Sequence, residues 1–188
     1  MSRPLLVACF ILSLASVMNA TPAAFPATEP DRFEIKLLPA GTLLEATAEG
    51  DYFSNSNRLF RPLFRYISDH GIAMTVPVET RSEPGAMYFW VAPAEVEKVS
   101  GDRDGVRVLE LPPRQVASHG QRGGYSARNF AAARDALLAW LATQPDWEPV
   151  GEPYGVYWNG PFTPWFLKRF EVHVPVRPAV AAPRADRP

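Results

Sequence analysis

The fold of this chain is read most directly from the stretch Gly71-Ile72-Ala73-Met74-Thr75-Val76-Pro77-Val78 and from the segment before it. That segment, Ser56 to Ser68, predicts a helix, because its large apolar residues recur at the spacing of one helix face, namely Phe60, Leu63, Phe64 and Ile67. Three arginines follow an adjacent stripe, namely Arg58, Arg61 and Arg65. The quoted stretch should leave the helix through a turn at Gly71 and continue as an extended strand.

The compact part of the chain, residues 32–177, contains two similar halves. Leu38-Pro39 in the first half corresponds to Leu111-Pro112 in the second, and Tyr52 corresponds to Tyr125. The order of predicted elements in each half is strand, strand, helix, strand, strand. Agreement of this pattern over both halves indicates an internal repeat.

Strands are expected where short runs rich in β-branched and aromatic residues lie between turn residues. The expected strands are Phe33–Leu38, Thr42–Glu49, Ala73–Arg81, Met87–Ala92, Val106–Leu111, Gln115–Gln121, Val150–Trp158 and Phe170–Val176. A second helix should begin after the N-cap Ser126 and run to about Leu141. Two such ββαββ pseudo-repeats predict an α+β fold, a distorted antiparallel β-barrel with two helices packed on it.

The first 20 residues have the pattern of a signal peptide. Arg3 precedes an apolar run from Leu5 to Val17, and Ala20 supplies a small residue at the expected cleavage site. The run is shorter than the roughly 20 residues that a membrane-spanning helix needs. We therefore expect a periplasmic or secreted bacterial protein with no stable membrane insertion after cleavage. The alternative is that the segment stays uncleaved as an N-terminal anchor. The only cysteine, Cys9, would leave with the signal peptide.

Composition bounds the rest of the chain. Residues 21–31 are rich in Pro and Ala and are expected to form a flexible leader, and residues 178–188 are expected to form a disordered tail. The formal net charge of the whole chain is −1, which gives no reason to expect a nucleic-acid partner or a polybasic membrane contact. The oligomeric state is left open by the sequence.

The predicted first helix is the best candidate for a binding surface. Its apolar strip, edged by guanidinium groups, suits a flat apolar ligand with carboxylate arms, because burial of the ligand is favourable and arginine pairs carboxylates at two points. The simpler interpretation is an ordinary amphipathic helix with one core face and one solvated face.

Several segments together resemble the SOUL/heme-binding-protein family. Its opening strand is similar to Phe33-Glu34-Ile35-Lys36, its first helix to residues 58–67, and its most specific motif to Ile72-Ala73-Met74-Thr75-Val76-Pro77-Val78. Near the end, residues 157–162 and 166–172 resemble its closing loop and strand. The resemblance extends over nearly all of the compact region.

The resemblance implies that the chain binds heme or a related tetrapyrrole without catalysing a reaction. The groove would lie beside the first helix and be completed by the loop before the last strand. Arg65 holds the family's basic position for a propionate, and Phe60 and Phe64 hold its large apolar positions. A second basic position of the family falls on Asn57, a departure for which Arg58 or Arg61 could substitute.

Other positions are weaker members of the implied groove. Met74 and Trp165 are candidate walls, although both residue types more often pack in a core. The place where some family members carry a histidine holds Leu37. His70 is then the weak candidate for an iron ligand, because it lies in the loop after the helix. We therefore expect that a porphyrin can bind without an axial protein ligand.

Two other classes of function stay open. A hydrolase or sequestering protein for another small amphiphile would need an activated carboxylate, with Glu171 and Glu45 as the candidates. A protein-interaction module would instead use the face of phenylalanines and arginines on the first helix. The sequence contains no Gly-x-Ser-x-Gly motif, no His-x-x-x-His pair and no cysteine cluster.

Overall fold

The computed structural model describes residues 22–160 and 162–179. Two α-helices, α1 and α2, and nine strands make up this part, with a 3₁₀ helix after β4 and another before β9. In chain order the strands and α-helices are β1 Phe33–Leu38, β2 Gly41–Thr47, α1 Tyr52–Asp69, β3 Val78–Arg81, β4 Ala86–Trp90, β5 Val106–Leu111, β6 Arg114–Arg122, α2 Ala127–Leu141, β7 Trp147–Pro149, β8 Tyr154–Tyr157 and β9 Arg169–Pro178.

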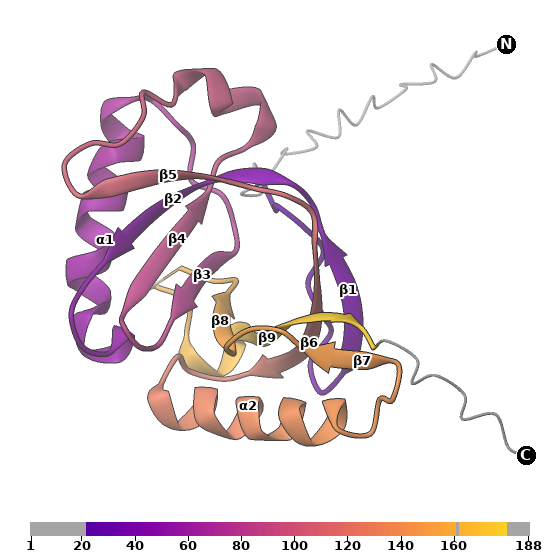
Figure 1. The fold of residues 1–188 in the computed structure, drawn as a ribbon. Coiled ribbons are helices and arrows are strands. Elements are labelled where there is room, and N and C mark those ends of the chain that lie inside the picture. Colours follow the sequence, from indigo (N-terminus) through magenta and orange to yellow (C-terminus); the bar gives the residue numbers. More distant parts are fainter. Residues whose placement is uncertain (1–21, 161, 180–188) are drawn as a thin grey trace, which may run out of the picture.

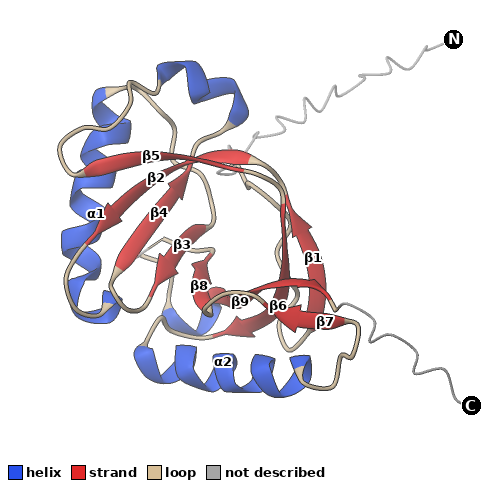
Figure 2. Ribbon diagram, viewed as in Figure 1, coloured by secondary structure: helices blue, strands red, loops and turns tan. Residues whose placement is uncertain are grey.

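The strands form one curled antiparallel sheet, a half-barrel, as the α+β prediction requires. Eight strands follow the order β1-β6-β9-β8-β3-β4-β2-β5, and β7 pairs with the outer part of β9. Figure 1 shows α1 and α2 on the outside of this curl, α1 beside β2 and β4 and α2 beside β6 and β9. Figure 2 shows the same division between helices in blue and strands in red.

The internal repeat is visible in the strand pairing. β1 of the first half pairs with β6 of the second, with Phe33 opposite His119, and β2 pairs with β5, with Leu44 opposite Val108. Each half thus contains two strands, a helix and two further strands, and the strands of both halves belong to the same sheet. The predicted ββαββ order is confirmed. The short strand β7 is an addition to the second half that the sequence pattern did not predict.

Helix α1 begins one turn earlier than the sequence analysis expects. Its N-cap is Asp51, whose side chain accepts a hydrogen bond from the Ser54 amide at 3.1 Å, so the helix includes Tyr52. The buried face of α1 packs on the sheet through five side chains, Tyr52, Leu59, Leu63, Tyr66 and Ile67. These side chains belong to the larger core, which α2 shares through Phe130, Ala133, Leu137 and Leu141.

The N-terminal segment differs from the expected flexible leader. Residues 22–30 cross the inner side of the curled sheet, where Ala24 donates a hydrogen bond to the Val76 carbonyl and Pro30 forms a bridge with Gly120. Phe25 is buried, with edge-on ring contacts to Trp90 and Trp158. Composition alone missed this order, because a single aromatic residue among Pro and Ala is enough to anchor the segment in a second apolar cluster.

Two other boundaries differ from the sequence-based expectation. Residues 73–77 run mainly outside a regular strand, so β3 begins only at Val78, and the expected strand Val150–Trp158 is reduced to β8. Residues 178–179 of the expected disordered tail are described, and Pro178 ends β9. The signal peptide and the rest of the tail lie outside the described residues. Within residues 22–160 and 162–179, no helix combines the length and hydropathy needed to cross a membrane.

Candidate functional site

One flank of α1 presents phenylalanines outside the core. Phe64 is 49% exposed and stacks on the half-buried Phe60 with ring centroids 5.4 Å apart. Phe60 in turn meets the buried Phe89 of β4 edge-on at 5.6 Å. The expected stripe therefore divides: Leu63 and Ile67 are buried in the core, while Phe60 and Phe64 lie at its border and leave an aromatic surface accessible.

Unpaired arginines follow the outer face of the same helix. Arg58, Arg61 and Arg65 are exposed, and none has an acidic side chain within ion-pair distance in the described part of the chain. At about 100° per residue, Arg61 lies roughly 60° around the helix axis from Phe64 and Arg65 lies about 100° from it. The guanidinium groups are thus available to an anion that lies over the phenylalanines.

The phenylalanine flank faces the side on which α2 begins. Phe53 lies on this flank, one heptad before Phe60, and its ring contacts Phe130 of α2 at 6.0 Å. The loop between β8 and β9 lies on the same side, because the Cβ of Trp165 is 3.8 Å from the position that a side chain at Gly124 would take. The flank of α1 and this loop are therefore two borders of one surface region.

The weaker members of the implied groove have different environments. Met74 is half-buried and packs against the main core, and Asn57 is exposed on α1. Trp165 is 70% exposed. The ring contacts of Trp165 in the described chain are with Phe166 alone, so no aromatic contact joins it to Phe60 or Phe64. In the described chain, no pair of aromatic rings joins this loop to Phe60 or Phe64.

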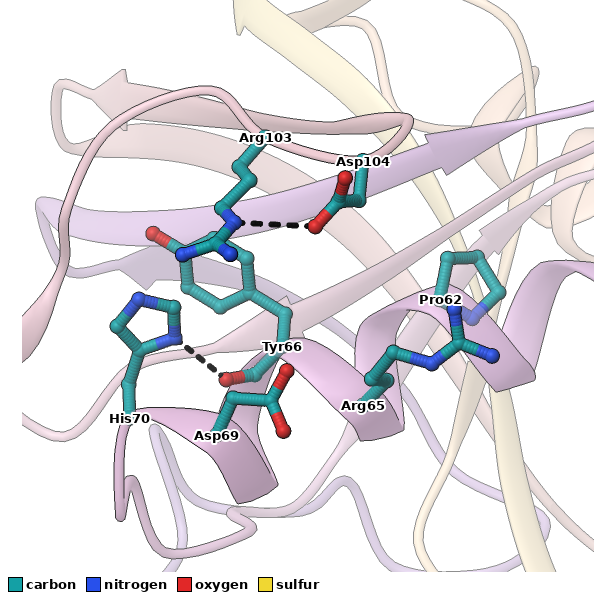
Figure 3. Close-up of a pocket in the computed structure, with 7 residues that line it drawn as sticks. All are labelled: Pro62, Arg65, Tyr66, Asp69, His70, Arg103 and Asp104. Carbon is teal, nitrogen blue, oxygen red and sulfur yellow. Dashed lines mark hydrogen bonds and ion pairs between the residues drawn. The ribbon is translucent and has the colours of Figure 1, made fainter.

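A small hollow lies on the other side of Arg65. Figure 3 shows its lining, which comes from α1 and from the segment before β5, namely Pro62, Arg65, Tyr66, Asp69, His70, Arg103 and Asp104. Its volume is about 10 Å³, enough for a single water molecule. A macrocycle does not fit in this hollow.

A larger hollow of about 460 Å³ lies at the far end of α2. Its lining is mainly apolar, namely Leu138, Leu141, Ala142, Gln144, Pro145, Trp147, Glu148, Pro149 and Ala179. The one charged side chain in it, Glu148, is acidic and pairs with Arg177. This hollow therefore lacks the cationic border that a ligand with carboxylate groups needs.

The ring nitrogens of His70 are both engaged. Nδ1 lies 2.7 Å from the Tyr66 carbonyl oxygen and Nε2 lies 2.7 Å from the Ser100 hydroxyl, while the ring stacks on Tyr66. Iron ligation by His70 would require the loss of one of these hydrogen bonds. The described residues contain no group of three or more His, Cys, Asp or Glu side chains placed to hold a metal ion.

Glu171, a candidate catalytic carboxylate, is the centre of a buried polar network. Its side chain is 1% exposed. Its two oxygens lie 2.7–3.1 Å from six groups that can donate a hydrogen bond, namely the Thr28 amide and hydroxyl, Lys36 Nζ, the Ser118 hydroxyl, Trp158 Nε1 and His173 Nε2. The single hydrogen of the Thr28 hydroxyl also has the Glu34 carboxylate as an acceptor at 2.6 Å. With its acceptors saturated and Thr28 covering it, Glu171 has the environment of a structural anchor. Glu45, the other candidate, is also buried and pairs with Arg107 at 3.1 Å.

The titration of this network is shifted by burial and by its partners. Burial raises the pKa of the Glu171 carboxyl, but hydrogen bonds and charge from His173 and Lys36 outweigh it and hold the pKa below its usual range. Burial lowers the pKa of His173 to about 4, against the opposing effect of Glu171. His173 is therefore neutral at pH 7 and donates from Nε2.

These shifts predict a loss of stability in mild acid. Between the unfolded pKa of His173, 6.5, and its folded pKa of about 4, the unfolded chain binds a proton that the folded chain does not. The free energy of unfolding should therefore fall as the pH falls through this window, by up to about 3 kcal/mol. Chemical denaturation at several pH values measures it. His173→Gln should flatten the slope and His70→Gln should keep it; equal slopes in both variants would refute the assignment.

The comparison with known families addresses the chain as a whole. The family model of the SOUL heme-binding protein matches residues 23–175. The chain belongs to the SOUL heme-binding protein family. The match begins in the N-terminal segment that crosses the inner side of the sheet and ends within β9, so it includes both halves of the SOUL fold and the phenylalanine flank of α1. No curated protein matches this chain in sequence.

The SOUL fold of this chain is similar to several solved structures. The EcmrR C-terminal domain superposes with a TM-score of 0.62 at 14% identity, covering 78% of this chain and 97% of that domain. A hydrolase from Listeria innocua superposes with a TM-score of 0.54 at 10% identity, covering 80% of this chain and 94% of its own. At such low identity these similarities concern the fold alone.

Some residues of this surface were not identified from the sequence. Phe53 extends the phenylalanine flank towards α2. Because Phe53 lies seven residues before Phe60, the sequence would have placed it on the same helix face if the helix had been predicted to begin at Tyr52. Lys36 and Thr28 complete the environment of Glu171 from positions far away in the sequence. No local sequence pattern predicts that Lys36 and Thr28 lie beside Glu171, because these contacts join residues that are far apart in the chain.

Proposed function

We propose that this protein binds heme or a related tetrapyrrole on the phenylalanine flank of α1, and buffers or carries it without chemical turnover. The observation that carries the proposal is the stacked pair of the half-buried Phe60 and the exposed Phe64, beside the unpaired guanidinium groups of Arg61 and Arg65. Membership of a heme-binding family supports the ligand class.

The residues present fit a porphyrin better than they fit an iron ion. Stacked aromatic rings offer a flat apolar surface, where burial contributes about 25 cal/mol per Å² of apolar area. The arginines can pair with carboxylate groups at the edge of the ligand. No histidine near the flank has a free ring nitrogen, since His70 uses both. We therefore propose that the ring and its carboxylates are recognised and that iron is not required.

The remaining parts of the proposal concern Met74, Trp165 and cellular location. Trp165, from the β8–β9 loop, would approach the far edge of the ligand, while Met74 would support the flank from within the core. The signal peptide predicted in residues 1–20 supports export to the periplasm or the medium. The saturated environment of Glu171 favours binding over hydrolysis, because a carboxylate with six hydrogen-bond donors has no lone pair free for water.

A titration tests this proposal. Metal-free protoporphyrin and heme are each added to the mature protein, and the Soret absorbance is followed. Both should saturate at one equivalent with similar affinity, and His70→Ala should not change the heme spectrum. Absence of a saturable change with either ligand would contradict the proposal. Binding of heme alone, lost in His70→Ala, would contradict recognition without iron.

Arg65→Glu tests the proposed carboxylate pairing. Reversing this charge should weaken protoporphyrin binding about tenfold, because one favourable ion pair becomes repulsive. Arg32→Glu is the matched control, since Arg32 is also exposed and lacks an ion pair in the described chain but lies beside β1. Equal affinities of the two variants would place the carboxylates elsewhere.

A further inference from the structure

The connection between β8 and β9 carries an unusual amount of exposed apolar surface. Four of its side chains are more than half exposed, namely Phe162 at 98%, Trp165 at 70%, Phe166 at 56% and Leu167 at 52%. We call these four residues the aromatic tip. Monomeric soluble proteins rarely expose large apolar side chains together, and such patches mark contacts with a partner or a membrane.

The base of this connection is held firmly. The Tyr125 hydroxyl donates to the Arg169 carbonyl at 2.9 Å and accepts from the Asn159 amide at 2.8 Å, so it ties both ends of the loop together. The Asn159 side chain also accepts from the Arg169 amide at 2.6 Å. The 3₁₀ helix Trp165–Leu167 stands on this base. The aromatic tip is therefore presented outward by a fixed support, with Phe162 almost fully in solvent.

The surroundings of the aromatic tip are basic. From Asn159 to Lys168 the chain contains no acidic residue. Lys168 lies over the Tyr125 ring at 4.9 Å, and Arg122 ends β6 beside β9. Arg128 lies in the first turn of α2, which follows Gly124, a residue beside Trp165. None of these three cations has an acidic partner within ion-pair distance in the described residues. Arg169, which lies opposite Arg122, does pair with Glu29, at 3.3 Å.

We propose that the aromatic tip docks on the surface of an anionic lipid bilayer. Tryptophan and phenylalanine bury apolar rings at the level of the lipid headgroups, and neighbouring lysine and arginine side chains pair with anionic headgroups. A projecting tip matches this role, because it reaches into a soft bilayer without needing a complementary cavity on a partner. The net charge of the chain does not indicate this lipid-binding surface, because the basic residues are concentrated around the aromatic tip.

Vesicle sedimentation tests the proposal with the mature, ligand-free protein. Vesicles are made of phosphatidylcholine with or without phosphatidylglycerol. The protein should partition onto the anionic vesicles and much less onto the neutral ones, and added salt should weaken the binding. No partitioning, or equal partitioning onto both kinds of vesicle, would overturn the proposal and leave a protein partner as the better explanation of the tip.

Two variants assign the binding to the aromatic tip. Trp165→Ser with Phe166→Ser should lower the partition coefficient about tenfold or more, as loss of two interfacial aromatic residues predicts. Leu37→Ser is the matched control, because Leu37 is 65% exposed on β1. Both changes lie at exposed positions and should leave the thermal unfolding midpoint nearly unchanged. Equal partitioning of the two proteins would overturn the assignment.

Discussion

Replacement of Glu171 by glutamine should lower the free energy of unfolding by about 3–5 kcal/mol. The carboxylate is 1% exposed and pairs with Lys36 at 2.7 Å. Its neutral amide would leave the nearly buried ammonium group with only the more distant and more exposed Glu34 carboxylate, at 3.8 Å, as a counter-charge. The amide nitrogen of glutamine is itself a donor, so it would also face the groups that now donate hydrogen bonds to the carboxylate. Because Thr28 bonds to the same carboxylate, the N-terminal segment should loosen as well. Urea denaturation measures the change.

Glu148→Gln is the matched control for this prediction. Glu148 pairs with Arg177 at the other end of the same strand β9, but both side chains are exposed. Loss of such a surface pair should change the free energy of unfolding by less than about 1 kcal/mol. If Glu171→Gln were as mild as Glu148→Gln, the network would be a solvated cluster and the role of an anchor for residues 22–30 would be wrong.

Phe64→Asp should weaken protoporphyrin binding about 10- to 100-fold. The change removes an exposed ring whose burial against a ligand would contribute about 1.5–3 kcal/mol, and it places a negative charge beside the ligand's carboxylates. The fold should tolerate it, because Phe64 is 49% exposed before any ligand binds. Absorbance titration gives the affinity.

The matched control is Leu138→Asp on α2. Leu138 is a helical apolar residue with 39% exposure, and it lines the larger hollow near β7. This variant should bind protoporphyrin as the unchanged protein does. Loss of affinity in Leu138→Asp with normal affinity in Phe64→Asp would move the site from α1 to that hollow.

The architecture could be predicted because its signals are local and repeated. The predicted apolar stripe identified the helix, and two of its members, Leu63 and Ile67, lie on the buried face of α1. Leu59, which is also buried there, was not part of that stripe. The order of strands and helices in the two halves then gives the α+β half-barrel. Boundaries were less certain, since the start of α1 depends on the cap at Asp51, one turn before the region where the apolar pattern is strongest.

The N-terminal segment could not be predicted, because its order depends on partners distant in sequence. Phe25 packs against Trp90 and Trp158, and Thr28 bonds to a carboxylate 143 positions away. Composition describes such a Pro- and Ala-rich segment as flexible whenever those partners are unknown. The same limit applies to His173, whose burial beside Glu171 follows from the register of β9 with its neighbouring strands.

The sequence predicts where the candidate residues lie on α1, while their role in binding stays a prediction. Phe60, Phe64 and Arg65 lie on one accessible part of α1, as the helical spacing requires. In the described chain, no aromatic ring of the β8–β9 loop contacts the ring of Phe60 or Phe64. The position of this loop relative to α1 does not follow from residue spacing, so the sequence could not predict how Trp165 lies.

Mapping the bound ligand by NMR tests the central claim most directly. Amide chemical shifts of the mature protein are recorded before and after one equivalent of metal-free protoporphyrin. We predict that the largest changes occur along Phe53–Arg65 of α1 and in the β8–β9 loop around Trp165, with little change in β1 or at the far end of α2. Changes centred on the inner side of the sheet or on the hollow near β7, with α1 unaffected, would contradict the account.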